Sequence, residues 1–238
     1  MRHTLLFSVL ATGCMVAPDE LGSSQSAVVA SNALTPNALT GNALTANALT
    51  ANALTANALT ANGMTEGELS REMLRYIYSC ALPATASMEL IIDGTSYGMY
   101  YGSLGLAPEW ATSSCAEDCQ GWVSACVLAR VNYWGITDQI SLRGSHPRLS
   151  LAPDEATNFP VQEGKFWGNL FGKKPVLRDC SAQNLEDLDD DDALPLRACT
   201  YPSSPCGITS VGSCDDVSFK KVPQVITVYV KSLHDLGL

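Results

Sequence analysis

The chain has 238 residues and a formal net charge of −10, from 24 acidic and 14 basic side chains. This balance argues against a nucleic-acid partner, because phosphate binding needs clustered lysine and arginine. With 46% hydrophobic residues but no run of about 18 apolar residues, the sequence predicts a folded domain and no membrane-spanning helix.

The N-terminal residues predict export from a bacterial cell. Arg2 supplies a positive charge, residues 5–11 are mostly apolar, and small residues precede Cys14, which is typical of a secretory signal peptide. The segment ends in Leu-Ala-Thr-Gly-Cys, which resembles the lipobox of bacterial lipoproteins. That resemblance implies removal of residues 1–13 and lipidation of Cys14, and Met15 after it favours the outer membrane. Plain secretion is the alternative.

Residues 32–65 form a five-residue repeat, with six N-A-L-T units followed by a related N-G-M-T unit. Five residues rotate a helix by about 140° from one leucine to the next, and an odd period in a strand alternates faces, so neither gives one apolar face. The period resembles that of the pentapeptide-repeat β-helix, but seven units make too few coils. We therefore expect a linker over residues 14–31 and a low-complexity spacer over 32–65.

The folded domain is expected over residues 66–238, beginning with a helix and a hairpin. Residues 65–68 fit a capping box, and apolar residues at helical spacing predict a helix to about residue 82, before a proline. An apolar run over 88–93 ends in Asp-Gly and is followed by residues 97–101. This pattern predicts two strands joined by a tight turn.

A second helix and three more strands complete the predicted domain. Residues 114–117 form another capping box, before a helix that carries Cys119 and Cys126 on its apolar face and ends near residue 133. Further strands are predicted over residues 136–143, 162–171 and 222–232. Helices and strands do not alternate regularly, so we expect an α+β fold, a small mixed domain stapled by disulfides.

Eight cysteines follow residue 79, and an even set in an exported chain indicates four disulfides. They are Cys80, Cys115, Cys119, Cys126, Cys180, Cys199, Cys206 and Cys214. Spacing leaves their pairing open, but two helical turns, about 10 Å, separate Cys119 from Cys126, too far for them to pair. We expect each of the two to bond to another element. Zinc binding is the disfavoured alternative.

One segment matches a catalytic pattern. Residues 94–98 read G-x-S-x-G, in which Ser96 would be the nucleophile of a hydrolase. A catalytic triad would need His146 and an acid, either Asp118 or Asp138. The residues after Ser96 do not begin a helix, so a hairpin turn is favoured over a nucleophile elbow.

Three other clusters could bind a ligand. Residues 143–147 bring arginine, serine and histidine together and could bind an anion, although a surface turn is favoured. An acidic run could bind calcium, but it lacks the glycine of an EF-hand loop, so a solvated loop is favoured and no metal is expected. The candidate ligands in this run are Asp189, Asp190, Asp191 and Asp192. Aromatic residues over 97–171 could stack on sugars, although most are expected in the core.

Four segments carry a family resemblance. They read SLGLAPEW over 103–110, QGWVSACVLARVN over 120–132, ISLRGSHP over 140–147 and EGKFWGNLF over 163–171. Together they resemble predicted secreted lipoproteins of myxobacteria, in which N-A-L-T tracts precede a cysteine-containing C-terminal domain. The resemblance covers most of residues 32–214 and implies no activity, so no catalytic residue follows from it.

Two classes of function remain open. We expect a lipid-anchored protein of the bacterial cell envelope, at the outer membrane or cell surface, that binds an envelope protein or a glycan. We expect no cofactor. A surface hydrolase that uses Ser96 or His146 is the alternative, and the scarcity of histidine favours the binding module.

Overall fold

A computed structural model describes residues 29–31, 34, 54–55, 67–132, 137, 139–172, 174–182 and 206–231. Its strands are β1 (Val29–Ser31), β2 (Ser87–Ile92), β3 (Thr95–Tyr101), β4 (Gln139–Arg143), β5 (Val161–Asn169), β6 (Val176–Ser181), β7 (Thr209–Ser213) and β8 (Ile226–Val230). Its helices are α4 (Glu68–Ala81), α5 (Glu117–Ala129) and α6 (Glu155–Asn158), with short 3-10 turns η1 (Pro108–Ala111), η2 (Pro147–Leu149), η4 (Cys214–Asp216) and η5 (Phe219–Lys221). This mixture confirms the predicted α+β fold. No helix within these ranges is long and apolar enough to cross a bilayer.

Six strands form the main sheet, in the order β1-β4-β8-β5-β6-β7. Neighbouring strands are antiparallel except for β6 and β7, which are parallel. Strand β8 pairs on both sides, with β4 and β5, and it buries Ile226, Val228 and Val230. Its β-branched residues suit a pleated, half-buried surface, which is why the sequence predicts this strand.

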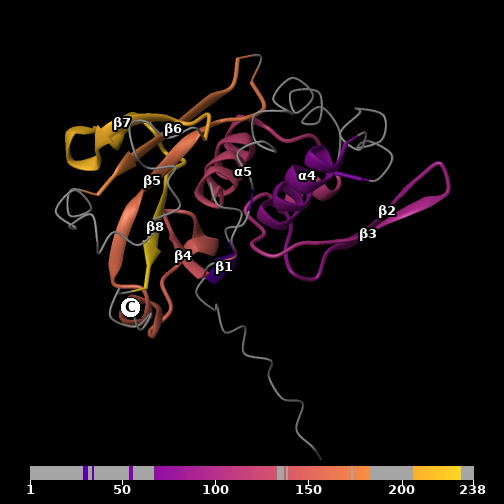
Figure 1. The fold of residues 1–238 in the computed structure, drawn as a ribbon, viewed down its shortest axis with the longest axis horizontal. Helices are drawn as coiled ribbons and strands as arrows, with labels where there is room; N and C mark the ends of the chain where they lie inside the picture. Colours follow the sequence, from indigo (N-terminus) through magenta and orange to yellow (C-terminus); the bar gives the residue numbers. More distant parts are fainter. Residues whose placement is uncertain are drawn as a thin grey trace, which may run out of the picture.

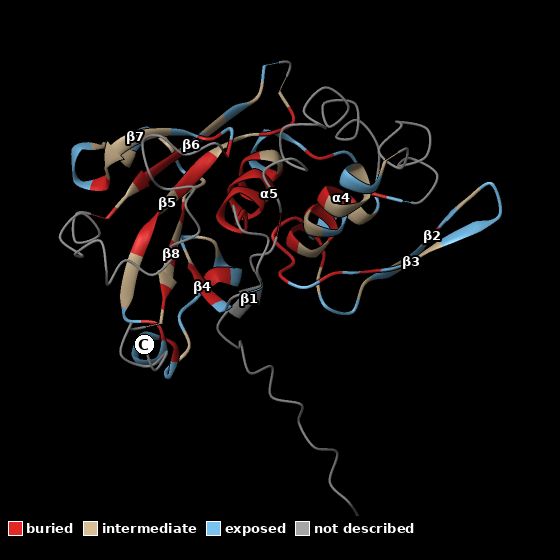
Figure 2. Ribbon diagram, viewed as in Figure 1, coloured by how far each residue is buried: buried red, intermediate tan, exposed pale blue. Residues whose placement is uncertain are grey.

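The two long helices form layers beside the sheet (Figure 1). Helix α5 packs against β5 and β8 on one side and against α4 on the other. Residues 121–129 are therefore all buried, as Figure 2 shows. A helix that is apolar on every side needs such a central position, whereas α4 buries one face, with Met73, Leu74 and Ile77.

Strands β2 and β3 form a separate hairpin that projects from α4, away from the main sheet (Figure 1). Asp93 and Gly94 at its turn have φ values of 48° and 78°. Two consecutive positive φ angles are typical of the two-residue turn that matches strand twist, and Asp-Gly adopts it readily. Ser96 therefore lies in β3, and the hairpin turn favoured from the sequence is confirmed.

Several predicted boundaries are wrong. Helix α4 begins after Gly67 and α5 after Ala116, so neither helix starts at the first residue of its predicted capping box, and neither Gly67 nor Ala116 makes a side-chain cap. Helix α5 ends at Ala129, about one turn early, because the chain turns there to meet Leu34. Strands β1, β6 and β7 were not predicted, because hydrogen bonds to neighbouring strands stabilise them more than their own sequences do.

Part of the expected linker and spacer joins the fold. Strand β1 pairs with β4 at one edge of the main sheet. Leu34 is completely buried, and its backbone N–H donates to the carbonyl of Arg130 at 3.3 Å. In return, the N–H of Asn132 donates to the carbonyl of Leu34 at 2.8 Å. These bonds place Leu34 beside the segment that follows α5.

A second repeat unit is also held by the domain. Leu54 is 3% exposed, and its N–H donates to the carbonyl of Trp110 at 2.7 Å. Residues from both the expected linker over 14–31 and the expected spacer over 32–65 therefore contribute to the fold. The β-helix alternative concerns repeat units that lie mostly outside the described residues.

Disulfides join the layers. The described pairs are Cys80–Cys126, Cys115–Cys119 and Cys180–Cys214. The predicted bond from Cys126 to another element is confirmed, because its partner lies on α4. The same prediction for Cys119 is wrong: the extended backbone before α5 brings Cys115 to a Cα separation of 5.4 Å. Cys206 is also disulfide-bonded, and Cys199 lies outside the described residues.

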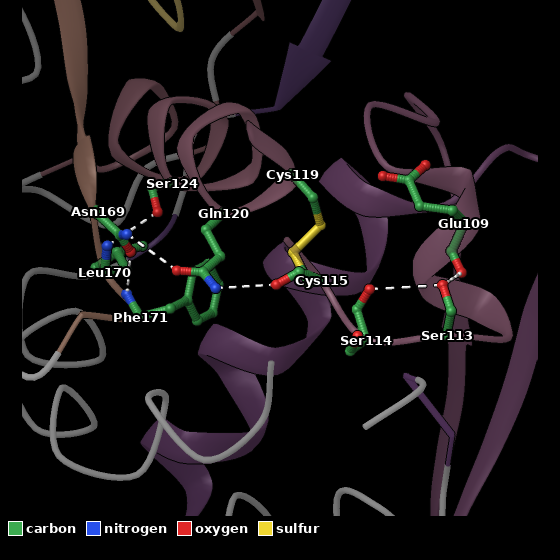
Figure 3. Close-up of a disulfide and its surroundings, with 10 residues drawn as sticks. All are labelled: Glu109, Ser113, Ser114, Cys115, Cys119, Gln120, Ser124, Asn169, Leu170 and Phe171. Atoms are coloured by element: carbon green, nitrogen blue, oxygen red, sulfur yellow. Dashed lines mark hydrogen bonds between the residues drawn. A yellow bond between two sulfur atoms is a disulfide. The ribbon is translucent and has the colours of Figure 1, made fainter. Parts of the chain in front are cut away.

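The Cys115–Cys119 loop is connected to the sheet through polar side chains (Figure 3). The side-chain amide of Gln120 donates to the carbonyl of Cys115 at 2.9 Å. Its oxygen accepts a hydrogen bond from Asn169 at the end of β5, at 3.0 Å. Asn169 in turn accepts from the N–H of Phe171 at 2.7 Å. This chain of bonds fixes the start of α5 relative to β5.

Candidate ligand-binding site

Several candidate site residues lie outside the described residues. They are Cys14, Asp138, Asp189, Asp190, Asp191 and Asp192. Within the described part of the chain, no group of three or more His, Cys, Asp or Glu side chains could hold a metal ion.

The two candidate catalytic residues have separate surroundings. Ser96 is exposed on the hairpin, where its hydroxyl donates to Glu89 at 2.7 Å and accepts from the N–H of Gly98 at 3.3 Å. His146 lies shortly after β4, which is a strand of the main sheet. Its described neighbours come from segments other than the hairpin. The structure therefore does not bring Ser96 and His146 together.

His146 holds local structure through one ring nitrogen. Its Nδ1 accepts a hydrogen bond from the N–H of Arg148, at the start of η2, at 3.1 Å. Burial has the largest effect on the pKa of His146 and lowers it, while the charge of Asp118 raises it. Asp118 is thus near His146, but the Nδ1 of the ring is already occupied by the N–H of Arg148.

In the predicted anion cluster, Arg143 is also occupied by contacts within the protein. The guanidinium of Arg143 donates to the hydroxyl of Ser141 at 2.8 Å and to the carbonyls of Glu155 and Phe159 at 3.2 and 2.7 Å. It also lies 3.7 Å from the centre of the Tyr229 ring. These contacts stabilise the loop after β4, so the favoured interpretation as a turn describes this segment better than an anion site.

A cleft between α4 and the hairpin gathers arginine and tyrosine side chains. It consists of two adjoining hollows of about 360 and 270 Å³ that share Arg75. The larger is lined by Glu68, Arg71, Glu72, Arg75 and Tyr97. The smaller is lined by Arg75, Tyr76, Ser79, Met99, Tyr100, Tyr101 and Arg130. We call the smaller one the Arg–Tyr hollow.

Each arginine of the cleft lies against a tyrosine ring. The guanidinium carbons of Arg71, Arg75 and Arg130 lie 4.4, 5.3 and 4.5 Å from ring centres. The rings belong, in the same order, to Tyr97, Tyr100 and Tyr76. Such cation–π contacts fix the planes of the guanidinium groups before any ligand arrives.

Arg130 is the deepest cation of the cleft. It is 7% exposed, and its Nη1 donates to the hydroxyl of Ser79 at 2.9 Å. Burial lowers its pKa to about 10, so the guanidinium remains charged at neutral pH. No carboxylate is among the described residues that line the Arg–Tyr hollow, although the chain as a whole has a net charge of −10. The hollow is therefore a cationic site on an acidic protein.

The outer wall of this hollow is apolar and open to solvent. Tyr101 is 63% exposed and Met99 is 42% exposed. The base of the hairpin is fixed to the end of α4, because the N–H of Ser103 donates to the carbonyls of Ser79 and Leu82 at 3.1 and 2.7 Å. A ligand in the hollow could therefore contact the aromatic rings of the hairpin on one side and the guanidinium groups on the other.

Sequence reasoning missed this cleft as a site. It identified the aromatic segment that contains Tyr97 and Tyr101 and expected most rings in the core, which Trp110, Trp122 and Trp167 confirm. The available signal was the pair Arg71 and Arg75, which share a helix face four residues apart. Comparisons with protein-family models, curated proteins and solved structures find no match.

Proposed function

We propose that the protein is a lipid-anchored binding module of the bacterial cell envelope that holds an acidic glycan in the Arg–Tyr hollow. One observation carries the proposal: two guanidinium groups and three tyrosines line a hollow without a lining carboxylate. Arginine pairs with carboxylate or phosphate through two parallel hydrogen bonds, and a partly desolvated site strengthens that attraction.

The exposed rings favour a glycan over a simple ion. The apolar face of a sugar packs on an aromatic ring such as Tyr101, while an acidic substituent reaches Arg75 or Arg130. An acidic peptide offers the charge without the flat ring face. No observation among the described residues favours the hydrolase, because Ser96 and His146 have separate partners.

The cellular location is part of the proposal. Disulfides persist in oxidising compartments outside the cytoplasm, and four described cysteine side chains on α4, α5 and the preceding loop are oxidised in pairs. The lipobox-like segment supplies the anchor at Cys14. Intact mass measurement of the cell-derived protein tests it: a lipidated N-terminal cysteine is expected, and an unmodified Cys14 would remove the anchor.

Calorimetric titration of the mature protein tests the ligand. We expect oligogalacturonate to bind, a neutral maltooligosaccharide of equal length not to bind, and affinity to fall with added salt. Arg75→Gln should weaken binding about tenfold or more, since hydrogen bonds to charged groups contribute roughly 1.5–3 kcal/mol.

Arg178→Gln is the matched control, because Arg178 is an exposed arginine on β6, outside the cleft. It should bind oligogalacturonate like the unaltered protein. Equal binding of the acidic and neutral sugars, or of polyglutamate and oligogalacturonate, would overturn the assignment to an acidic glycan.

A further inference from the structure

Leu34 and Leu54 occupy the same position in two N-A-L-T units, and both are buried in the domain. The two leucines dock at different places. The Val131 docking site consists of the backbone of residues 130–132, which holds Leu34 through two hydrogen bonds and a parallel bridge. The Trp110 docking site holds Leu54 through the carbonyl of Trp110.

Backbone pairing and one buried leucine are common to both docking sites. An extended segment that adds backbone hydrogen bonds to a domain gains affinity from its main chain and specificity from its alternate side chains. Here the specificity element is a leucine flanked by alanine and threonine, which is the same in every one of the six N-A-L-T units.

Four of the six units end in alanine, and nothing in their sequence assigns one of them to the Trp110 docking site. The fifth residue differs only in the first two units, which end in Pro36 and Gly41. Leu49 or Leu59 could therefore replace Leu54 at Trp110 with the same flanking residues. The cost of closing the connecting loops changes slowly with their length, so this replacement is only weakly opposed.

From these identical units we infer that the two docking sites bind the N-A-L-T sequence itself, so that the tract of a second copy of the chain can dock on this one. A unit from the same chain competes at an effective concentration in the millimolar range. Exchange between copies therefore becomes important where copies are crowded. This inference does not depend on the glycan proposal: both involve Arg130, but docking uses its backbone carbonyl and the proposed glycan site uses its guanidinium.

Photo-crosslinking of the mature chain tests binding between molecules. The probe is a peptide of three N-A-L-T-A units with a photoreactive leucine in the central unit, and the control is the same composition in scrambled order. We expect crosslinks in the tryptic peptides that contain Trp110 and residues 130–132, half-saturated near millimolar probe. Crosslinks absent from both peptides, or equal for the probe and the scrambled control, would overturn the inference.

Substitution of leucines in the full chain tests interchangeability. Leu54→Ala should lower the thermal midpoint by well under half as much as Leu128→Ala, whose leucine is completely buried in α5 and has no repeat to replace it. Replacing Leu49, Leu54 and Leu59 together should be clearly worse than Leu54→Ala alone. If Leu54→Ala alone matches Leu128→Ala, the docking site is specific to one residue and the inference fails.

Discussion

At the scale of single residues, Arg130 has a structural role in addition to its proposed role in binding. Its carbonyl accepts the N–H of Leu34, while its side chain contacts Ser79 and Tyr76 at the bottom of the Arg–Tyr hollow. Removing one partner of a buried hydrogen bond costs stability, because the other partner loses its bond. Substitution of Arg130 should therefore affect both stability and binding, and the two are measured separately.

Arg130→Met should lower the free energy of unfolding by about 1–3 kcal/mol, because Ser79 loses its hydrogen bond and Tyr76 its cation–π contact. The same substitution should abolish binding of oligogalacturonate, since the deepest cation is lost. Urea denaturation and calorimetry measure the two quantities. Retained affinity in a folded Arg130→Met protein would contradict the assigned role.

His146 should make stability depend on pH. Its folded-state pKa lies below 6.5, mainly because of burial and also because of Arg148, against the raising effects of Asp118, Glu109 and the Leu106 hydrogen bond. Below about pH 6.5 the unfolded chain therefore binds more protons at His146 than the folded chain does. The stability that neutral His146 contributes to the fold is fully present above that pH and is lost as the pH falls through the folded-state pKa. Thermal midpoints at neutral and mildly acidic pH measure this loss. In His146→Gln it should be smaller, and an unchanged loss would contradict the prediction.

At the scale of elements, the disulfides differ in what they stabilise. Cys80–Cys126 spans 46 residues and joins α4 to α5, whereas Cys115–Cys119 spans 4 residues beside one helix. A longer loop restricts the unfolded chain more when it is closed. The two bonds should therefore contribute unequally to stability.

Replacing Cys80 and Cys126 by alanine should cost about 4 kcal/mol of unfolding free energy, and replacing Cys115 and Cys119 about 2 kcal/mol. Urea denaturation of the two double variants measures the difference. Equal losses would show that native contacts around the short loop, such as the one from Gln120, outweigh chain entropy.

The elements that the sequence predicts well have strong internal patterns. Helix α4 has an amphipathic period and a following proline, and the hairpin has an Asp-Gly turn. Strands β1 and β7 are short edge strands whose stability comes from their neighbours, so their own residues give little signal. The cleft was missed for a related reason: Arg75, Tyr101 and Arg130 come from three separate segments, and only the folded topology brings them together.

At the scale of the whole molecule, residues before position 66 contribute to the fold, some before the repeat tract and some within it. Strand β1 extends the main sheet, and Leu34 and Leu54 are buried. The domain expected over residues 66–238 would lose these contacts if it were produced without the preceding residues.

A chain that begins at residue 66 should be less stable than the mature chain by about 4 kcal/mol, because burying a leucine contributes roughly 2 kcal/mol. Urea denaturation of both proteins, with their disulfides intact, measures the difference. An unchanged midpoint would show that Leu34 and Leu54 are dispensable and that the tract is only a spacer.

The position of β1 also limits the reach of the domain. Strand β1 begins 15 residues after Cys14, so a fully extended connection spans about 50 Å. The 34-residue repeat tract resembles a long stalk in the sequence, but it lies after the point where the chain joins the sheet. If Cys14 carries the lipid, the tract therefore adds nothing to the distance between the lipid and the sheet. The domain would then reach only ligands that lie close to the bilayer, and the proposed glycan would have to be one of them.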